Sequence, residues 1–180
     1  MKLDAWSVRL HQLASGRVTL VAVVVFLLFV GVVLPAWTGG ADVPAPDLMF
    51  TYSASRLYEV ADALGENGRF AYIRDRFTLD VIWPVIYTFF LVTTISWLAQ
   101  HGLERTSGWQ RANLLPLAAV LFDLLENVST ALVMARYPAE TAVVASLAGF
   151  FTLFKWLLVG ASFAVWAFVA WCALYRLLRH

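Results

Sequence analysis

The sequence contains only one cysteine, Cys172, among its 180 residues. A single thiol can form neither an intrachain disulfide nor a relay between two cysteines. This excludes the four-helix membrane oxidoreductases, which need cysteine pairs, and junctional proteins of the claudin type, which need a disulfide in their first loop.

Charged and metal-ligating side chains are also scarce. Asp, Glu, Lys and Arg make up 14% of the chain and the net charge is only +1, so the composition predicts no basic face for nucleic acid. His11, His101 and His180 are scattered near the ends of apolar runs, and their spacing matches no zinc or haem motif. We therefore expect no nucleic-acid partner, no metal and no cofactor.

Apolar residues are what the chain has in abundance. They make up 61% of the sequence, and the mean hydropathy is +0.74, far above that of an ordinary soluble domain. Four long runs can each cross the hydrocarbon layer as a helix. We predict an all-α polytopic membrane protein, a four-transmembrane-helix bundle forming one domain over residues 1–180. The predicted segments are spans at about 18–38, 80–101, 114–135 and 144–172, and an extracytoplasmic loop at about 39–79.

Basic residues predict the orientation of these spans in the inner, cytoplasmic membrane. Short loops on the cytoplasmic side of a membrane protein carry an excess of Lys and Arg. Seven such residues flank the spans on one side: Lys2, Arg9, Arg17, Arg105, Arg111, Arg176 and Arg179. Both termini are therefore expected to be cytoplasmic, with the lipid bilayer as the principal partner.

The long loop is predicted to contain one or two amphipathic helices. It opens with the extended Gly- and Pro-rich segment TGGADVPAPD. In SASRLYEVADALG, Ser53 or Ser55 can cap a helix that Gly65 ends, with an apolar stripe facing the bilayer or the bundle. The following RFAYIRDRFTLD is either a second interfacial helix or the projecting first turns of the second span.

Two acids interrupt the third apolar run, LFDLLENVSTALVMA. Asp123, Glu126 and Asn127 are spaced i, i+3 and i+4, so a helix places them on one face. Each charge at the centre of a membrane helix costs about 2.5 to 3.5 kcal/mol on insertion scales. The two acids therefore require a partner, water or protonation.

Lys155 in the fourth span is the expected partner. Counted from the short turn that joins the two spans, Glu126 lies roughly 15 Å deep, Asp123 roughly 20 Å and Lys155 roughly 21 Å. Helical side chains lean toward their own N-terminus, so the heads of Glu126 and Lys155 should converge. We predict a cluster of two acids, an amide and an ammonium, with Thr152 adding a hydroxyl one turn before Lys155.

Two further groups could complete a ligand site around this cluster. Asp80, Trp83 and Tyr87 share one face at the start of the second span and could form the rim of a cavity, although Asp80 could equally cap the helix and Trp83 sit in an aromatic belt. A lid over the cavity, or else a solvated face, could come from the basic and aromatic residues of the loop: Arg69, Tyr72, Arg74 and Arg76.

Several functions fit this pattern. The favoured hypothesis is a buried pocket that binds a lipid-like amphiphile through the acids, Asn127 and Lys155. The main alternative is an intramembrane acid-base enzyme of isomerase, cyclase or epoxide-opening type, with Glu126 or Asp123 as the acid and Lys155 tuning them. Other possibilities are a proton-coupled transporter, which would need a homodimer, an accessory subunit of a larger membrane complex, and a cluster that only fixes helix register.

Overall fold

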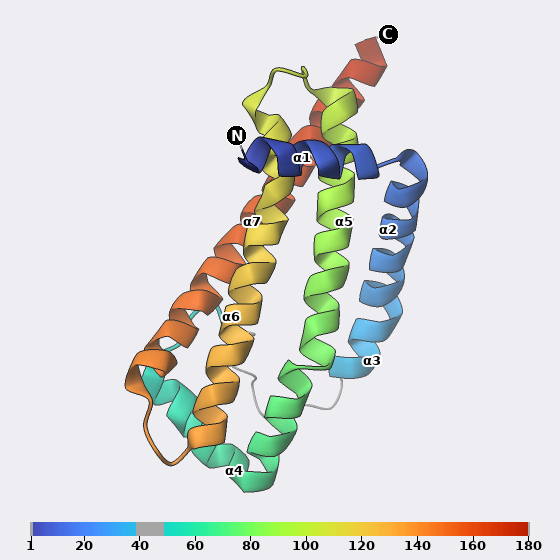
Figure 1. Ribbon diagram of the computed structural model, residues 1–180. Helices are drawn as coiled ribbons and strands as arrows, with labels where there is room; N and C mark the ends of the chain where they lie inside the picture. Colours follow the sequence, from blue (N-terminus) through green and yellow to red (C-terminus); the bar gives the residue numbers. More distant parts are fainter. Residues whose placement is uncertain (1, 39–48, 180) are drawn as a thin grey trace. The chain divides into compact units, whose positions relative to one another are not determined.

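The computed structural model describes residues 2–38 and 49–179 and is helical throughout that part of the chain (Figure 1). Helix accounts for 88% of it, with no strand among the described residues. The Gly- and Pro-rich linker predicted after the first span lies almost wholly outside these residues. Among the described residues, four stretches are long and apolar enough to cross a membrane: Gly16–Ala36, Ala54–Gly102, Gly108–Arg136 and Ala142–Arg179. The predicted all-α fold with four candidate spans is confirmed, while insertion in a bilayer stays a prediction.

The first candidate span is not a uniform α-helix. After α1 (Lys2–Leu13), the chain forms α2 (Gly16–Leu28), a π-helical turn η1 (Phe29–Val33) and α3 (Leu34–Thr38). Pro35 explains the break, because its ring has no amide hydrogen and would collide with the carbonyl one turn earlier in a regular α-helix. A π turn directly before the proline widens the helix at that point.

Helix α4 (Ala54–Arg76) comprises two stretches joined at Gly65. Ser53 caps its start, and the Ser53 hydroxyl oxygen accepts a hydrogen bond from the Arg56 amide at 3.2 Å. Gly65 has φ 61° and ψ −178°, a conformation that side-chain-bearing residues rarely adopt, so the first stretch ends where predicted. The helix then resumes as a second stretch that ends before α5 begins.

The three remaining long helices are α5 (Leu79–Gly102), α6 (Leu115–Arg136) and α7 (Ala142–Arg179), with the short 3-10 helix η3 (Gly108–Leu114) leading into α6. Two of them, α5 and α6, follow the predicted spans closely, whereas α7 extends beyond the predicted end at about residue 172 to Arg179. At 38 residues, α7 is about 57 Å long, which exceeds the hydrocarbon thickness of about 30 Å. A bilayer could therefore cover only part of α7 unless the helix tilts.

The chain divides into two compact units. The first unit comprises Met1–Gly40, Ile86–Ala118 and Leu158–His180, and the second comprises Ala41–Val85 and Ala119–Leu157. Helices α5, α6 and α7 contribute residues to both units. The expectation of one transmembrane domain over the whole chain stays a prediction.

Buried polar contacts hold α1 in the first unit, where it runs crosswise to α2 (Figure 1). The Ser7 hydroxyl donates to Asn113 Oδ1 at 2.8 Å, and Asn113 Nδ2 donates to Ser96 Oγ at 2.9 Å. The end of α5 approaches α7 so closely that a Cβ on Gly102 would lie 2.6 Å from the backbone nitrogen of Ala173. These contacts connect the N-terminal helix, α5, η3 and the last part of α7.

The core of the second unit lies between α4, α6 and α7. Its buried members are Tyr52, Leu57, Val60, Ala61, Val133, Met134, Ala145 and Ala148. The apolar stripe of α4 therefore faces helices α6 and α7, which was one of its two predicted placements. Small alanines on α7 opposite the larger residues of α6 let these two helices come close.

Candidate functional site

A buried ion pair joins α6 and α7 in the second unit. Lys155 Nζ lies 2.6 Å from Glu126 Oε2 and 4.0 Å from Asp123 Oδ1. Glu126 is 0% exposed, and Asp123 and Lys155 are both buried. The short Nζ–Oε2 distance is typical of a charge-assisted contact. The predicted convergence of Glu126 and Lys155 is confirmed, and Glu126 is the closer of the two acids.

Two buried threonines, one on α6 and one on α7, donate their hydroxyl protons to backbone carbonyls of their own helices. The Thr152 hydroxyl donates to the Ala148 carbonyl at 3.0 Å, and the Thr130 hydroxyl donates to the Glu126 carbonyl at 3.0 Å. Both side chains are fully buried. Thr152 is therefore buried one turn before Lys155, with its proton used within α7, and its part in a ligand site stays a prediction.

Tyr52 adds a phenol that the sequence did not predict. Its hydroxyl donates to Glu126 Oε1 at 3.4 Å, so Glu126 lies between a phenol and an ammonium. The segment before α4 reaches this place because Gly149 has no side chain, and a Cβ there would collide with the Tyr52 carbonyl oxygen. The Thr51 hydroxyl also donates to the Gly149 carbonyl at 3.3 Å.

The surroundings of Tyr52 predict an abnormal titration. Burial raises the pKa of the Tyr52 phenol, and the negative charge of Glu126 raises that pKa further. Tyr52 should stay protonated at alkaline pH while exposed tyrosines ionise. We expect the ultraviolet phenolate difference spectra of native wild type and Tyr52→Phe to coincide at about pH 11, above the usual tyrosine pKa of about 10. A larger phenolate signal in the native wild type would contradict this arrangement, and denatured samples should differ by one tyrosine.

Arg76 connects α4 to the start of α5 beside the acid cluster. Its guanidinium is buried, lies 2.9 Å from Asp80 Oδ2 and sits 4.4 Å from the centre of the Tyr72 ring. The Arg76 carbonyl accepts a hydrogen bond from Asn127 Nδ2 at 3.4 Å. Asp80, Tyr72 and Asn127 are thus linked through Arg76, which lies in the interior rather than on an exposed lid.

The other predicted ligand residues lie elsewhere. Arg69 donates to the Ala61 carbonyl at 3.1 Å and lies over the ring of Tyr137, at 4.9 Å from its centre. Trp83 is half-buried on α5, whereas Tyr87 is buried in the first unit. Of the predicted lid residues, Tyr72 and Arg76 contact each other, whereas Arg69 contacts Tyr137, and a lid formed by these residues stays a prediction.

The cluster has a surplus of negative charge and of hydrogen-bond acceptors. Lys155 is the one cation that the described ion pairs give to two acids, Asp123 and Glu126, and the neighbouring Arg76–Asp80 pair is balanced, so the five groups together carry a net charge of −1 if all are ionised. Asn127 is only 1% exposed, and its Oδ1 accepts no hydrogen bond from any described residue. A proton or an external donor could satisfy this surplus.

The remaining observations do not assign the cluster to a known type of site. Within residues 2–38 and 49–179, no group of three or more His, Cys, Asp or Glu side chains is arranged to hold a metal ion. Comparisons with protein-family models, with curated proteins and with solved structures gave no match.

Proposed function

We propose that the protein is an integral membrane protein that binds a lipid-like amphiphile at the buried cluster of the second unit. The observation that supports this is the unused acceptor Asn127 Oδ1, buried in a cluster with more carboxylates than cations. A ligand that brings a hydroxyl or ammonium group would supply the missing donor. Its apolar body would occupy the hydrophobic surroundings that helices α6 and α7 provide.

The proposed setting is the inner membrane with both termini in the cytoplasm. Seven basic residues flank the candidate spans on the side of the termini, which supports this orientation. Helix α4 would then be an amphipathic loop helix on the extracytoplasmic side, with its apolar stripe packed on α6 and α7. Tyr52 and Arg76 would bring polar groups from that side toward the cluster.

A second candidate function is intramembrane acid-base catalysis by Glu126. The observation that favours it is the position of the Glu126 carboxyl group between the Tyr52 hydroxyl and the Lys155 ammonium. A carboxyl group with one partner on each oxygen can exchange a proton with a bound apolar substrate when one partner moves away. Isomerisation, cyclisation or epoxide opening would each need such a group.

Native mass spectrometry with ligand identification tests the binding proposal. We expect the wild type to carry one defined amphiphile, and Asn127→Leu to lose most of it, because leucine has a similar volume but no acceptor. Ser129→Ala is the matched control, since the Ser129 hydroxyl on the same helix donates to the Leu125 carbonyl within α6. Equal occupancy in the two variants, or no defined molecule in the wild type, would refute the proposal.

The same samples separate binding from catalysis. The amphiphile extracted from the wild type is incubated with fresh wild type and with Glu126→Gln, and its products are identified by chromatography and mass spectrometry. Chemical conversion by the wild type alone would favour the acid-base enzyme. Recovery of the unchanged molecule from both proteins would favour the binding protein.

A further inference from the structure

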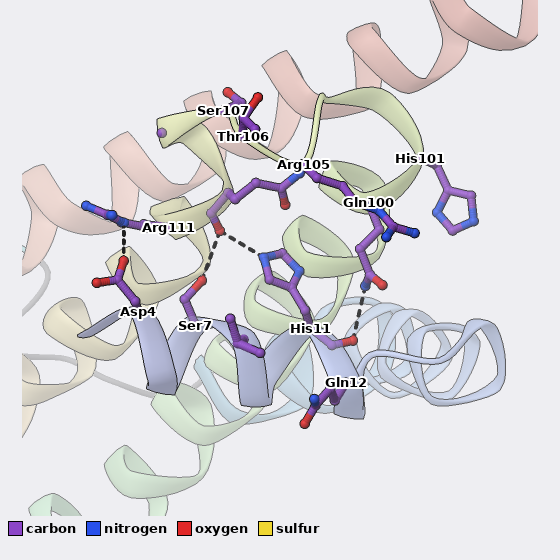
Figure 2. Close-up of a pocket in the computed structure, with 13 residues that line it drawn as sticks. Asp4, Ser7, His11, Gln12, Gln100, His101, Arg105, Thr106, Ser107 and Arg111 are labelled. Carbon is purple, nitrogen blue, oxygen red and sulfur yellow. Dashed lines mark hydrogen bonds and ion pairs between the residues drawn. The ribbon is translucent and has the colours of Figure 1, made fainter. Parts of the chain in front are cut away.

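The first unit contains a second polar site, formed by α1, the end of α5 and the segment leading into η3. It is a cavity of about 660 Å³, large enough for a small ligand or a lipid headgroup (Figure 2). The residues that carry its polar and charged character are Asp4, His11, His101, Arg105, Ser107 and Arg111. Figure 2 shows His11 between the Asp4–Arg111 pair on one side and His101 on the other.

His11 fixes α1 against the other elements of this pocket. Its Nδ1 lies 3.1 Å from the Ser96 carbonyl oxygen, and its Nε2 lies 3.0 Å from the Gln110 carbonyl oxygen. Both ring nitrogens therefore contact backbone carbonyls, one on α5 and one on η3, which anchors α1 to these two elements. Gln100 Nε2 also donates to the His11 carbonyl at 3.1 Å, which further secures the end of α1.

The two arginines of the pocket differ in their partners. Arg111 Nε lies 2.6 Å from Asp4 Oδ1, so the one acid lining the pocket is already paired. Arg105 forms no hydrogen bond or ion pair with any residue in the described part of the chain. Its guanidinium therefore keeps all five donors available, in a fork that matches the oxygens of a phosphate group.

Hydroxyl groups beside Arg105 add neutral donors. The Ser107 oxygen accepts a hydrogen bond from the Trp109 amide at 3.3 Å, which leaves the Ser107 proton able to point toward a ligand. Thr106 also lines the pocket. Guanidinium and hydroxyl donors together are the set that binds phosphate oxygens in proteins.

The charge of the whole first unit favours an anionic ligand. Its segments contain seven Lys and Arg residues and two acids, Asp4 and Glu104, which gives a formal charge of +5. The second unit contains six basic and ten acidic residues, a formal charge of −4. The net charge of +1 therefore conceals an uneven distribution of charge between the two units, and the phosphate-matching pocket lies in the basic one.

We infer that this pocket binds a phosphate group through Arg105, either on the headgroup of an anionic phospholipid or on a soluble phosphate ester. Basic pockets beside membrane helices on the cytoplasmic side are known to hold phosphate-bearing headgroups. The pocket belongs to the first unit and uses none of the residues of the Glu126–Lys155 cluster. Its test is therefore independent of the function proposed for the second unit.

The experiment titrates the full-length protein in neutral detergent with phosphatidylglycerol, phosphatidylcholine and glycerol 3-phosphate. Lipid binding is followed by native mass spectrometry and glycerol 3-phosphate binding by calorimetry. We expect Arg105→Gln to raise the Kd for phosphatidylglycerol roughly tenfold, as loss of a charge-assisted pair would do. The control variant Arg17→Gln removes another exposed charge of the same unit, outside the pocket. It should raise the Kd for phosphatidylglycerol by roughly twofold or less.

Comparing the wild type with Arg105→Gln in each titration shows whether the phosphate group belongs to a lipid headgroup or to a soluble ester. Dependence for phosphatidylglycerol but not for glycerol 3-phosphate would assign a lipid headgroup, and dependence for glycerol 3-phosphate would assign a soluble phosphate ester. Either outcome supports the phosphate site. Equal effects of Arg105→Gln and Arg17→Gln in every titration would overturn it, as would equal binding of the two lipids together with no binding of glycerol 3-phosphate. Circular dichroism of both variants verifies that they are folded.

Discussion

Lys155→Met should lower the free energy of unfolding by about 3–5 kcal/mol, the usual cost of leaving a buried charge without its partner. Glu126 is 0% exposed and lies 2.6 Å from Lys155 Nζ, so no water can replace the ammonium without opening the helices. Asp123, which lies 4.0 Å from the same nitrogen, would lose this contact as well. Reversible unfolding in mixed detergent micelles measures the change.

A double-mutant cycle is the control for this prediction. Glu126→Leu removes the other partner, and the double variant Lys155→Met with Glu126→Leu replaces the whole pair by apolar side chains. We expect the double variant to be more stable than Lys155→Met alone, with a coupling of about 1–3 kcal/mol, because neither residue is left unpaired. If the two single losses simply add, Lys155 and Glu126 do not form the pair that the structure shows.

The second large effect is expected at Gly149. Gly149→Ala should destabilise the protein by about 1–3 kcal/mol, since the new methyl group would collide with the Tyr52 carbonyl oxygen and push the segment before α4 away from α7. Gly160→Ala on the same helix is the matched control. A Cβ there meets nothing within 4 Å, so the gain in helix propensity should leave stability unchanged or raise it by up to about 1 kcal/mol.

Tyr52 provides a readout that separates local displacement from general unfolding. In Gly149→Ala the Tyr52 phenol should leave Glu126 and ionise at lower pH than in the wild type, while Gly160→Ala should keep the wild-type titration. Ultraviolet titration of the native variants measures this difference. Indistinguishable stability and titration of the two variants would show that Gly149 does not have to accommodate Tyr52.

The helices and the central ion pair could be predicted because both depend on local pattern. Long apolar runs bounded by turns define these helices, and the structure places α5 and α6 within a few residues of the predicted spans. The short turn between α6 and α7 makes the two helices antiparallel neighbours. Lys155 and the two acids lie at similar depths from that turn, and helical side chains lean toward their own N-terminus, so the heads of Glu126 and Lys155 could be predicted to converge.

The contributions of Tyr52 and Arg76 could not be predicted in this way. Tyr52 precedes α4 and lies 74 positions from Glu126, and no helical spacing relates two segments so far apart. Arg76 lies in a stretch rich in charged residues that is typical of a solvated surface, yet its side chain is buried. Only the packing of α4 on α6 and α7 brings these groups inward, and the one hint in the sequence is Gly149 beside bulky neighbours.

The ion pair between α6 and α7 also bears on the synthesis of the protein. The acids of α6 emerge from the ribosome before Lys155 of α7, so the helix that carries the negative charges is complete while its neutralising residue is still being made. In a membrane, α6 alone would be a poor insertion substrate, because its carboxylates are costly in hydrocarbon. In the proposed membrane setting, integration of α6 would depend on the arrival of α7, and the helical hairpin, rather than the single helix, would be the unit that enters the lipid.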